Sequence, residues 1–266
     1  MKFEAFFSSV GIEYYAVADF QDTRLINENL LAREDFSPRS VILFLVPYYT
    51  LTPKNISRYA ASYDYHLIIR SIGEGLCRAL KEDFPNAKMK IYGDHSPIDE
   101  RSIALTHGLG ILGDNGLLIN EKYGSYIFIG DLICDIPPEA LSATAPKEVR
   151  FCTHCGACRA ACPTGILRGE GDGCLSAITQ RKGELEQWEQ ELMRRVHTAW
   201  GCDLCQSACP YNKSPEKTPI RMFYDNVLEE LTRERLDLMT KEEFSNRAFS
   251  WRGRKVVERN LDILEK

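Results

Sequence analysis

Eight of the ten cysteines in this 266-residue chain lie between Cys152 and Cys209, and no other feature restricts its fold so strongly. Secreted disulfide scaffolds are short and follow an apolar leader, whereas this chain is long and begins Met-Lys-Phe-Glu. We therefore expect a cytoplasmic protein whose clustered thiols are reduced and act as metal ligands.

The clustered cysteines form two groups that each end in Cys-Pro. The first group has the spacing C-x2-C-x2-C-x3-C-P, which is typical of ferredoxin [4Fe–4S] clusters. The second group, C-x2-C-x3-C-P, lacks one thiol, which Cys174 can supply. Because the last cysteine of such a run binds the other cluster, we predict two [4Fe–4S] clusters with crossed ligands. Cluster one would use Cys152, Cys155, Cys158 and Cys209, and cluster two would use Cys162, Cys174, Cys202 and Cys205.

Zinc is the alternative metal, since paired C-x2-C motifs also build four-cysteine zinc sites. Eight thiols with C-x3-C-P in both groups fit two iron–sulfur clusters better. The remaining cysteines, Cys77 and Cys134, stand among apolar residues, and we expect them to be buried rather than to bind metal.

The region before the cysteines alternates predicted strands with predicted helices. β-branched and aromatic runs predict strands at 13–18, 40–48, 88–92 and 125–132. Helical spacing of apolar residues predicts a helix from near Ser57 to Pro85, and Ser96 looks like the N-cap of another that stops at Gly108. This order predicts an α/β (α+β) fold. The longest apolar run, 41–46, has the length of a buried strand and not of a membrane span.

Four glycines fall within residues 108–116 and would let the backbone approach a ligand closely. The segment is not a Walker A loop, because no Lys-Ser/Thr follows, and it is not a dinucleotide fingerprint, because a predicted helix precedes it. A tight turn between a helix and a strand is the alternative.

Several stretches together resemble the epoxyqueuosine reductase family, which completes the queuosine base in transfer RNA. They are Arg58-Tyr59-Ala60 with Asp64-Tyr65-His66, Asp94-His95-Ser96-Pro97 with Glu100-Arg101, Gly108-Leu109-Gly110 to Asn115 with Gly124-Ser125, the cysteine groups, and Phe249-Ser250-Trp251-Arg252 to Arg259-Asn260. The resemblance covers nearly the whole chain and implies a cobalamin-dependent iron–sulfur oxidoreductase. Its parts would be an α/β cobalamin-binding domain at 1–148, a ferredoxin-like double-cluster domain at 149–215 and a short helical tail at 216–266.

The resemblance also implies roles for individual residues. Asp94 matches the family's proposed general acid, and a carboxyl that faces a corrin in an apolar pocket would stay protonated near neutrality. The alternative is that Asp94 only caps or turns the chain ahead of Pro97. The family binds cobalamin base-off, without a histidine under the cobalt, and this chain lacks Asp-x-His-x-x-Gly. The implied cobalamin contacts are Arg58, Tyr59, Asp64, His66, Ser96, Gly108, Gly110, Gly113, Asn115 and Ser125.

The sequence departs from the family pattern in three places. Asp114 stands where the glycine-rich turn usually has lysine, which reverses a charge beside a phosphate-bearing cofactor. The N-terminal region is shorter than usual, and the chain stops at Lys266 after one helix that resembles the start of the family's HEAT-like repeats, which help to hold transfer RNA. The expected partners are a flavodoxin- or ferredoxin-type electron donor and transfer RNA, with no membrane. A short paralogue acting on a small molecule and a cobalamin-free electron-transfer protein remain the alternatives.

The tail is locally basic although the chain has a net charge of −5. Its cations between positions 247 and 259 are Arg247, Arg252, Arg254, Lys255 and Arg259. They could contact phosphates, but we favour a solvated helix face. The apolar side chains expected to pack this helix on the core are Trp251, Val256, Val257 and Leu261.

Overall fold

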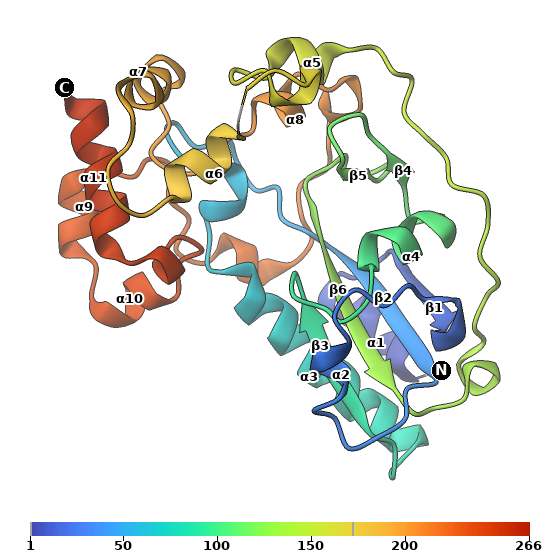
Figure 1. The fold of residues 1–266 in the computed structure, drawn as a ribbon. Coiled ribbons are helices and arrows are strands. Elements are labelled where there is room, and N and C mark those ends of the chain that lie inside the picture. The colour runs from blue at the N-terminus through green and yellow to red at the C-terminus, as the bar shows by residue number, and fades with distance from the viewer. Residues whose placement is uncertain (1, 172) are drawn as a thin grey trace.

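The computed structural model describes residues 2–171 and 173–266, and it has three regions (Figure 1). A sheet with its covering helices forms the lower right of the figure, and the cysteine-bearing segment with its short helices lies at the top. The C-terminal helices gather on the left. No helix of the described residues is long and apolar enough to cross a membrane.

The sheet has four strands in the order β1-β2-β6-β3, and every neighbouring pair is antiparallel. The strands are β1 (Tyr15–Asp19), β2 (Ser40–Pro47), β6 (Ile127–Cys134) and β3 (Met89–Gly93). Each predicted strand is present to within a few residues, and β2 is buried along its whole length. Helices separate the strands in sequence, but β3 pairs with β6 and not with β2. With its antiparallel pairs, the fold is therefore α+β.

Helices cover both faces of this sheet because its strands alternate in side-chain direction. On one face, α1 (Lys2–Val10) and α3 (Tyr65–Asp83) pack on Phe44. On the other, α4 (Glu100–Thr106) packs on Leu43. Cys134 is buried in the first core and Cys77 packs against it, so neither lies with the clustered thiols.

Two predicted helix starts are wrong. The first helix begins at Tyr65 rather than near Ser57, because Asp64 caps it by accepting a hydrogen bond from the His66 amide. Residues 58–60 form a separate 3-10 turn. The second helix is capped by Asp99 rather than Ser96, since the Asp99 side chain accepts from the Ser102 amide at 3.1 Å.

The glycine-rich segment forms a tight turn, but this turn joins two short strands rather than the helix and strand of the alternative. A two-stranded hairpin, β4 (Ile111–Leu112) and β5 (Leu118–Ile119), closes when the Gly116 amide donates to the Gly113 carbonyl at 2.8 Å. Gly116 has φ +78°, which a glycine adopts without strain. The sequence is therefore rich in glycine here because the chain reverses tightly.

Most remaining helices are short and belong to the cysteine segment and the tail. They are α5 (Ala157–Ala161), α6 (Leu175–Gln180), α7 (Gln187–Val196), α8 (Leu204–Ser207), α9 (Arg233–Leu238), α10 (Lys241–Ser245) and α11 (Arg254–Glu265), while α2 (Glu28–Leu31) belongs to the sheet region. Helices α6 and α7 share a core with α11, so the two regions pack together. The boundary at residue 216 stays a prediction, and Ile220 and Phe223, which follow it, pack in the core of the sheet region.

The tail partly follows its prediction. Val256, Val257 and Leu261 are buried around Trp200 as expected. The prediction for Trp251 is wrong, because this residue is 59% exposed. Its ring lies against the Arg252 guanidinium, 3.8 Å from the ring centre, and does not pack on the core.

Three of the five tail cations bind other parts of the chain. Arg247 is buried, with its guanidinium against the carbonyls of Ala61 and Ser62. Arg259 donates to two backbone carbonyls of the loop after α6, and Arg254 pairs with Asp237 and Glu258. These three side chains therefore stabilise the fold, whereas the favoured interpretation placed them on a solvated helix face.

The sheet region and the cysteine segment meet at Gly124. The amide of Asn212 donates to the Ser125 hydroxyl and to the Gln206 carbonyl, both at 2.8 Å, while its oxygen accepts from the Ser125 backbone. Gly124 has φ +60°, and an added Cβ would clash with the oxygen of Asn212. Only glycine therefore allows this joint to close.

We expect Gly124→Ala to lower the free energy of unfolding much more than Gly169→Ala does. Both glycines have positive φ, which costs alanine about 1–2 kcal/mol, but a Cβ at Gly169 meets nothing within 4 Å. Alanine at 124 should cost a further ~1–3 kcal/mol, because the buried Asn212 amide loses its partners. Urea unfolding under anaerobic conditions measures the free energy of unfolding of both variants. Equal losses would contradict the close contact between Gly124 and Asn212.

Candidate active site

Four thiols surround a small cavity of about 20 Å³ beside α5. They are Cys152, Cys155, Cys158 and Cys209. The first three come from one motif group and the last from the other, as the crossed ligand pattern predicts for cluster one. Gly156, with φ +75°, turns the backbone around this cavity.

The other four thiols line a second cavity, of about 450 Å³. They are Cys162, Cys174, Cys202 and Cys205, the set predicted for cluster two. Burial tends to raise the pKa of Cys162, but backbone amides of Leu167, Thr164 and Gly165 donate to the thiol and bring its pKa below the ordinary value. Such amide donors stabilise a thiolate, which is the form that binds iron.

The second cavity is larger than its thiols need, and its far side is mostly apolar. Phe128 and Ile127 of β6 form part of that side, next to Leu117. Three of the implied cobalamin contacts also line it: Tyr59, Asn115 and Ser125. None of its described lining residues is a histidine.

Other implied cobalamin contacts lie away from this cavity. Gly108 and Gly110 line a different groove, and Gly113 lines the first cavity, because the β4–β5 turn sends its two ends to opposite sides. Ser96 is buried beneath the sheet. Arg58 lies behind the lining, where its guanidinium pairs with Asp203 at 3.1 Å. The geometry of the second cavity does not support a corrin contact for these residues.

Asp94 lies near the cavity rather than on it. It follows β3 with φ +63°, and its carboxylate accepts from the Tyr65 hydroxyl at 2.7 Å. The Tyr65 ring stacks on Phe128 with 3.8 Å between ring centres, and Phe128 lines the second cavity. Two aromatic rings thus connect the Asp94 carboxylate to the cavity.

The surroundings of Asp94 favour proton exchange. His66 lies 3.8 Å from the Asp94 carboxylate through Nε2, and its Nδ1 lies 2.7 Å from Asp64. The hydrogen bond to Asp64 raises the pKa of His66, and burial followed by the charge of Asp94 raises the pKa of Tyr65. Tyr65 is therefore a neutral donor, and His66 holds a proton more readily than an ordinary histidine.

Two sequence arguments about Asp94 do not match this geometry. The Asp94 side chain is 66% exposed, so the apolar pocket expected around it is not formed in this structure. Of the alternative roles, capping is wrong because Asp99 caps α4, whereas Asp94 does turn the chain after β3 with its φ of +63°. The left-handed backbone turns the carboxylate outward to Tyr65 instead.

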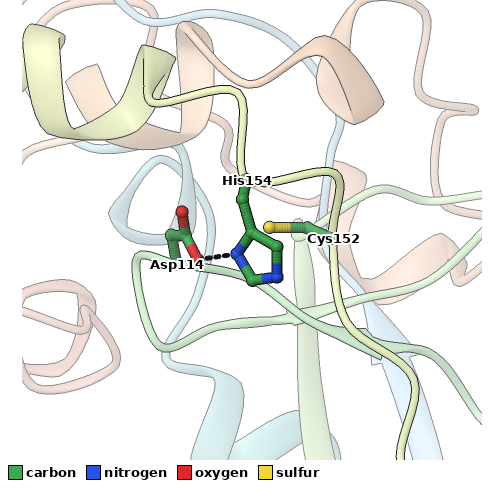
Figure 2. Close-up of side chains that lie close together, drawn as sticks. All are labelled: Asp114, Cys152 and His154. Atoms are coloured by element: carbon green, nitrogen blue, oxygen red, sulfur yellow. Dashed lines mark hydrogen bonds and ion pairs between the residues drawn. The ribbon is translucent and has the colours of Figure 1, made fainter.

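Asp114, the departure from the family's lysine, binds the cysteine loop. Figure 2 shows the His154 ring directed at Asp114, with 2.6 Å between Nδ1 and the carboxylate oxygen and the Cys152 thiol beside them. This hydrogen bond lowers the pKa of Asp114. The three groups supply fewer ligands than the four of a structural zinc site, and Cys152 also faces the first cavity. Asp114 therefore anchors the loop that carries Cys152 and His154.

Sequence reasoning gave no role to two polar residues of this site, Asp203 and Gln206, or to Asp131 on the neighbouring strand. Asp203 accepts from Ser57 and from the Arg58 amide, and Gln206 donates to Ser125. Asp131 is fully buried on β6. The signal for Asp131 was available, because an acid interrupts the apolar run 127–134.

Two family profiles match the chain. One, described as epoxyqueuosine reductase QueG, DUF1730, matches residues 36–95, and the other, a 4Fe-4S double cluster binding domain, matches residues 151–212. The second profile spans all eight clustered cysteines, so the chain carries a double-cluster iron–sulfur domain.

Solved structures establish the fold. An epoxyqueuosine reductase from Bacillus subtilis, with its catalytic aspartate loop swung out of the active site, matches with a TM-score of 0.77 at 23% identity over 98% of this chain and 79% of that chain. An epoxyqueuosine reductase with an epoxyqueuosine-modified tRNA-Tyr stem loop gives a TM-score of 0.77 at 22% identity, over the same shares.

Curated relatives are closer in sequence. The epoxyqueuosine reductase of Listeria monocytogenes is 33% identical over 222 residues, which cover 78% of this chain and 56% of the relative. That of Cyclobacterium marinum is 30% identical over 231 residues, which cover 79% of this chain and 68% of the relative. The chain thus spans little more than half of the Listeria protein and about two thirds of the Cyclobacterium protein. By this similarity, the chain belongs to the epoxyqueuosine reductase family.

Proposed function

We propose that this chain is an oxidoreductase that removes the epoxide oxygen of epoxyqueuosine in transfer RNA, using two [4Fe–4S] clusters and base-off cobalamin. The second cavity carries the proposal, because it places four thiols next to an apolar chamber that Phe128 and Tyr65 connect to Asp94. The names of the relatives, and the stem loop bound to one solved relative, support the substrate.

The residues present suit the clusters. The amide nitrogen of Asn115 is buried without an acceptor among the described residues, and its side chain faces the Cys205 thiol. An iron-bound thiolate at Cys205 would provide that acceptor. The two quartets proposed from the spacing would each hold one cluster, and clusters supply electrons singly.

The apolar part of the second cavity suits a corrin. In this proposal the region 1–148 contributes Tyr59, Ser125 and Phe128 as contacts. Bound cobalamin would supply a low-valent cobalt for the two-electron reduction. The absence of histidine from the described lining agrees with base-off binding.

The chain's own side chains would handle protons. Loss of the epoxide oxygen requires a proton at that oxygen, and Asp94 would donate it as the general acid. Tyr65 orients the Asp94 carboxyl through its 2.7 Å hydrogen bond, and the neighbouring His66 would return a proton to Asp94. The swung-out loop of the Bacillus subtilis relative supports movement of the loop that carries Asp94.

Cobalamin added to anaerobically purified protein should give a base-off, five-coordinate cobalt(II) signal in electron paramagnetic resonance, with about eight irons per chain. Leu117→Trp should abolish the bound-cobalt signal and keep the iron, because Leu117 lines the second cavity. Leu238→Trp is the matched control, since Leu238 is 68% exposed. Eight irons with cobalt free in solution would leave an electron-transfer protein instead.

The substrate needs a separate test. We expect the epoxyqueuosine-modified stem loop to bind with an affinity that falls as salt rises, as phosphate contacts require. Reduction of a free epoxyqueuosine nucleoside without stem-loop binding would favour the small-molecule paralogue.

A further inference from the structure

Asp131 is a buried acid in an apolar environment. It lies in the middle of β6, where its register partners are Leu43 on β2 and Tyr92 on β3, and it is fully buried. Side chains on the same face of β2 and β6, including Leu43 and Ile133, belong to an apolar core. A lone carboxylate at such a position would be strongly destabilising.

Helix α4 packs on β6, and a second carboxyl, that of Glu100 on α4, lies beside Asp131 with its Oε2 buried. Ser96 donates to one Asp131 oxygen at 3.0 Å, but the other oxygen and the Oε2 of Glu100 are both buried and receive no hydrogen from any described residue. Neither acid forms an ion pair with a described cation. Two ionised carboxylates can only accept hydrogen bonds, so one of them must carry a proton for the pair to bond.

We propose that Glu100 and Asp131 share a proton and thereby position the segment from Asp94 to Asp99 against β6, and that alkaline loss of this proton loosens the segment. Ser96 transmits the effect, because it lies two residues after Asp94 and bonds directly to Asp131. The consequence for catalysis rests on the proposed function of Asp94, whereas the proton-sharing pair itself does not.

Backbone contacts hold the other side of the segment. The amides of Ile26 and Asn27 both donate to the Pro97 carbonyl, and the Asp99 amide donates to Arg24. Asp94 stands at the start of the segment, in a left-handed conformation that a non-glycine residue adopts at a cost. The hydrogen bond from Ser96 to Asp131 is thus the attachment nearest to Asp94 that links the segment to the acid pair.

The charges around the pair all oppose ionisation. Asp94 and Asp99 are the acidic neighbours on its own segment, Tyr92 is its register partner on β3, and its partner on β2 is the apolar Leu43. Beyond Tyr92, Glu34 accepts from the Tyr92 hydroxyl and pairs with Lys90, and Arg101 is bonded to the Gly116 carbonyl. Burial, and then the neighbouring acids, raise the pKa of Glu100, and burial raises the pKa of Asp131.

These directions fix the sign of the pH effect. In the unfolded chain both acids ionise near pH ~4, whereas the folded pair keeps a proton to higher pH. The folded state therefore binds more protons, and its stability is greatest below the unfolded pKa and falls as pH rises toward the folded pKa.

The decisive variant is Glu100→Gln, whose amide donates to Asp131 without needing a proton. Between about pH 5 and 8, the unfolding equilibrium constant of the wild type should rise relative to this variant by up to about tenfold per pH unit. Glu139→Gln, which changes an exposed acid, should keep the wild-type pH dependence. Infrared spectroscopy should also show a protonated carboxylic acid at neutral pH that Glu100→Gln with Asp131→Asn removes.

Activity adds a separate readout. The rate of Glu100→Gln should persist to higher pH than that of the wild type, while Glu100→Ala should lose rate at all pH values. An unchanged pH slope of stability in Glu100→Gln, or no protonated acid in the wild type, would overturn the proton-sharing pair. If stability and infrared results hold but no epoxide is reduced by any variant, the proposed function fails and the pair stands.

Discussion

Asp94→Asn should lower the single-turnover rate of epoxide reduction by about 100- to 10,000-fold, the usual contribution of a general acid. Asparagine keeps the shape of the side chain, and its oxygen can still accept the hydrogen bond from Tyr65. Its amide cannot give a proton to the departing oxygen. Iron content, cobalamin binding and stem-loop affinity should therefore stay at wild-type values while the chemical step slows.

Two companion variants make this result specific. Tyr65→Phe removes only the orienting hydroxyl, so its loss of rate should be smaller than that of Asp94→Asn. Asp22→Asn changes an acid on the 3-10 turn Phe20–Asp22, outside the site, and should not alter the rate. A wild-type rate in Asp94→Asn would remove Asp94 from the mechanism and direct attention to His66.

Cys209→Ser should reduce the iron content from about eight to about four per chain by removing cluster one, although Cys209 belongs to the second motif group. The expectation follows from the first cavity, where Cys209 lies with thiols of the first group. Electron transfer to substrate should fail in this variant, because a single cluster cannot complete the relay. Iron analysis and electron paramagnetic resonance of the reduced protein measure both effects.

Double variants separate the crossed arrangement from a sequential one. Cys155→Ser with Cys209→Ser should still hold about four irons, because both thiols line the same cavity. Cys205→Ser with Cys209→Ser should hold almost none, because the two thiols line different cavities. The opposite pattern would assign each cluster to its own motif group. Cys77→Ser, outside both cavities, is the control and should retain all the iron.

Local sequence was enough to predict the thiol groups and the strands. Motif spacing predicts two quartets because it depends on a few neighbouring residues, and the run 41–46 predicts a buried strand because every side chain in it is apolar. The start of α3 was not predictable in this way. Ser57 and Arg58 are held out of the helix by Asp203, which is distant in the sequence.

Local sequence also could not predict which part of the glycine-rich segment lies next to the second cavity. Gly108 and Gly110 have the composition of a ligand loop, yet packing of the hairpin turns them toward Tyr14 and Phe151. Strand pairing likewise depends on packing between distant segments, because nothing near Met89 indicates that β3 pairs with β6. Asp131 could have been found from its apolar neighbours, but its partner Glu100 is identified only by the packing of α4.

The joint at Ser125 suggests an order for maturation. Gln206 and Asn212 bind Ser125 just ahead of β6, and the second cavity draws its cysteines from separate stretches on both sides of α6 and α7. These bonds fix the segment after Cys202 relative to the sheet. The sheet region would then act as a template for the second cavity, whose shape would be complete only after β6 is in place.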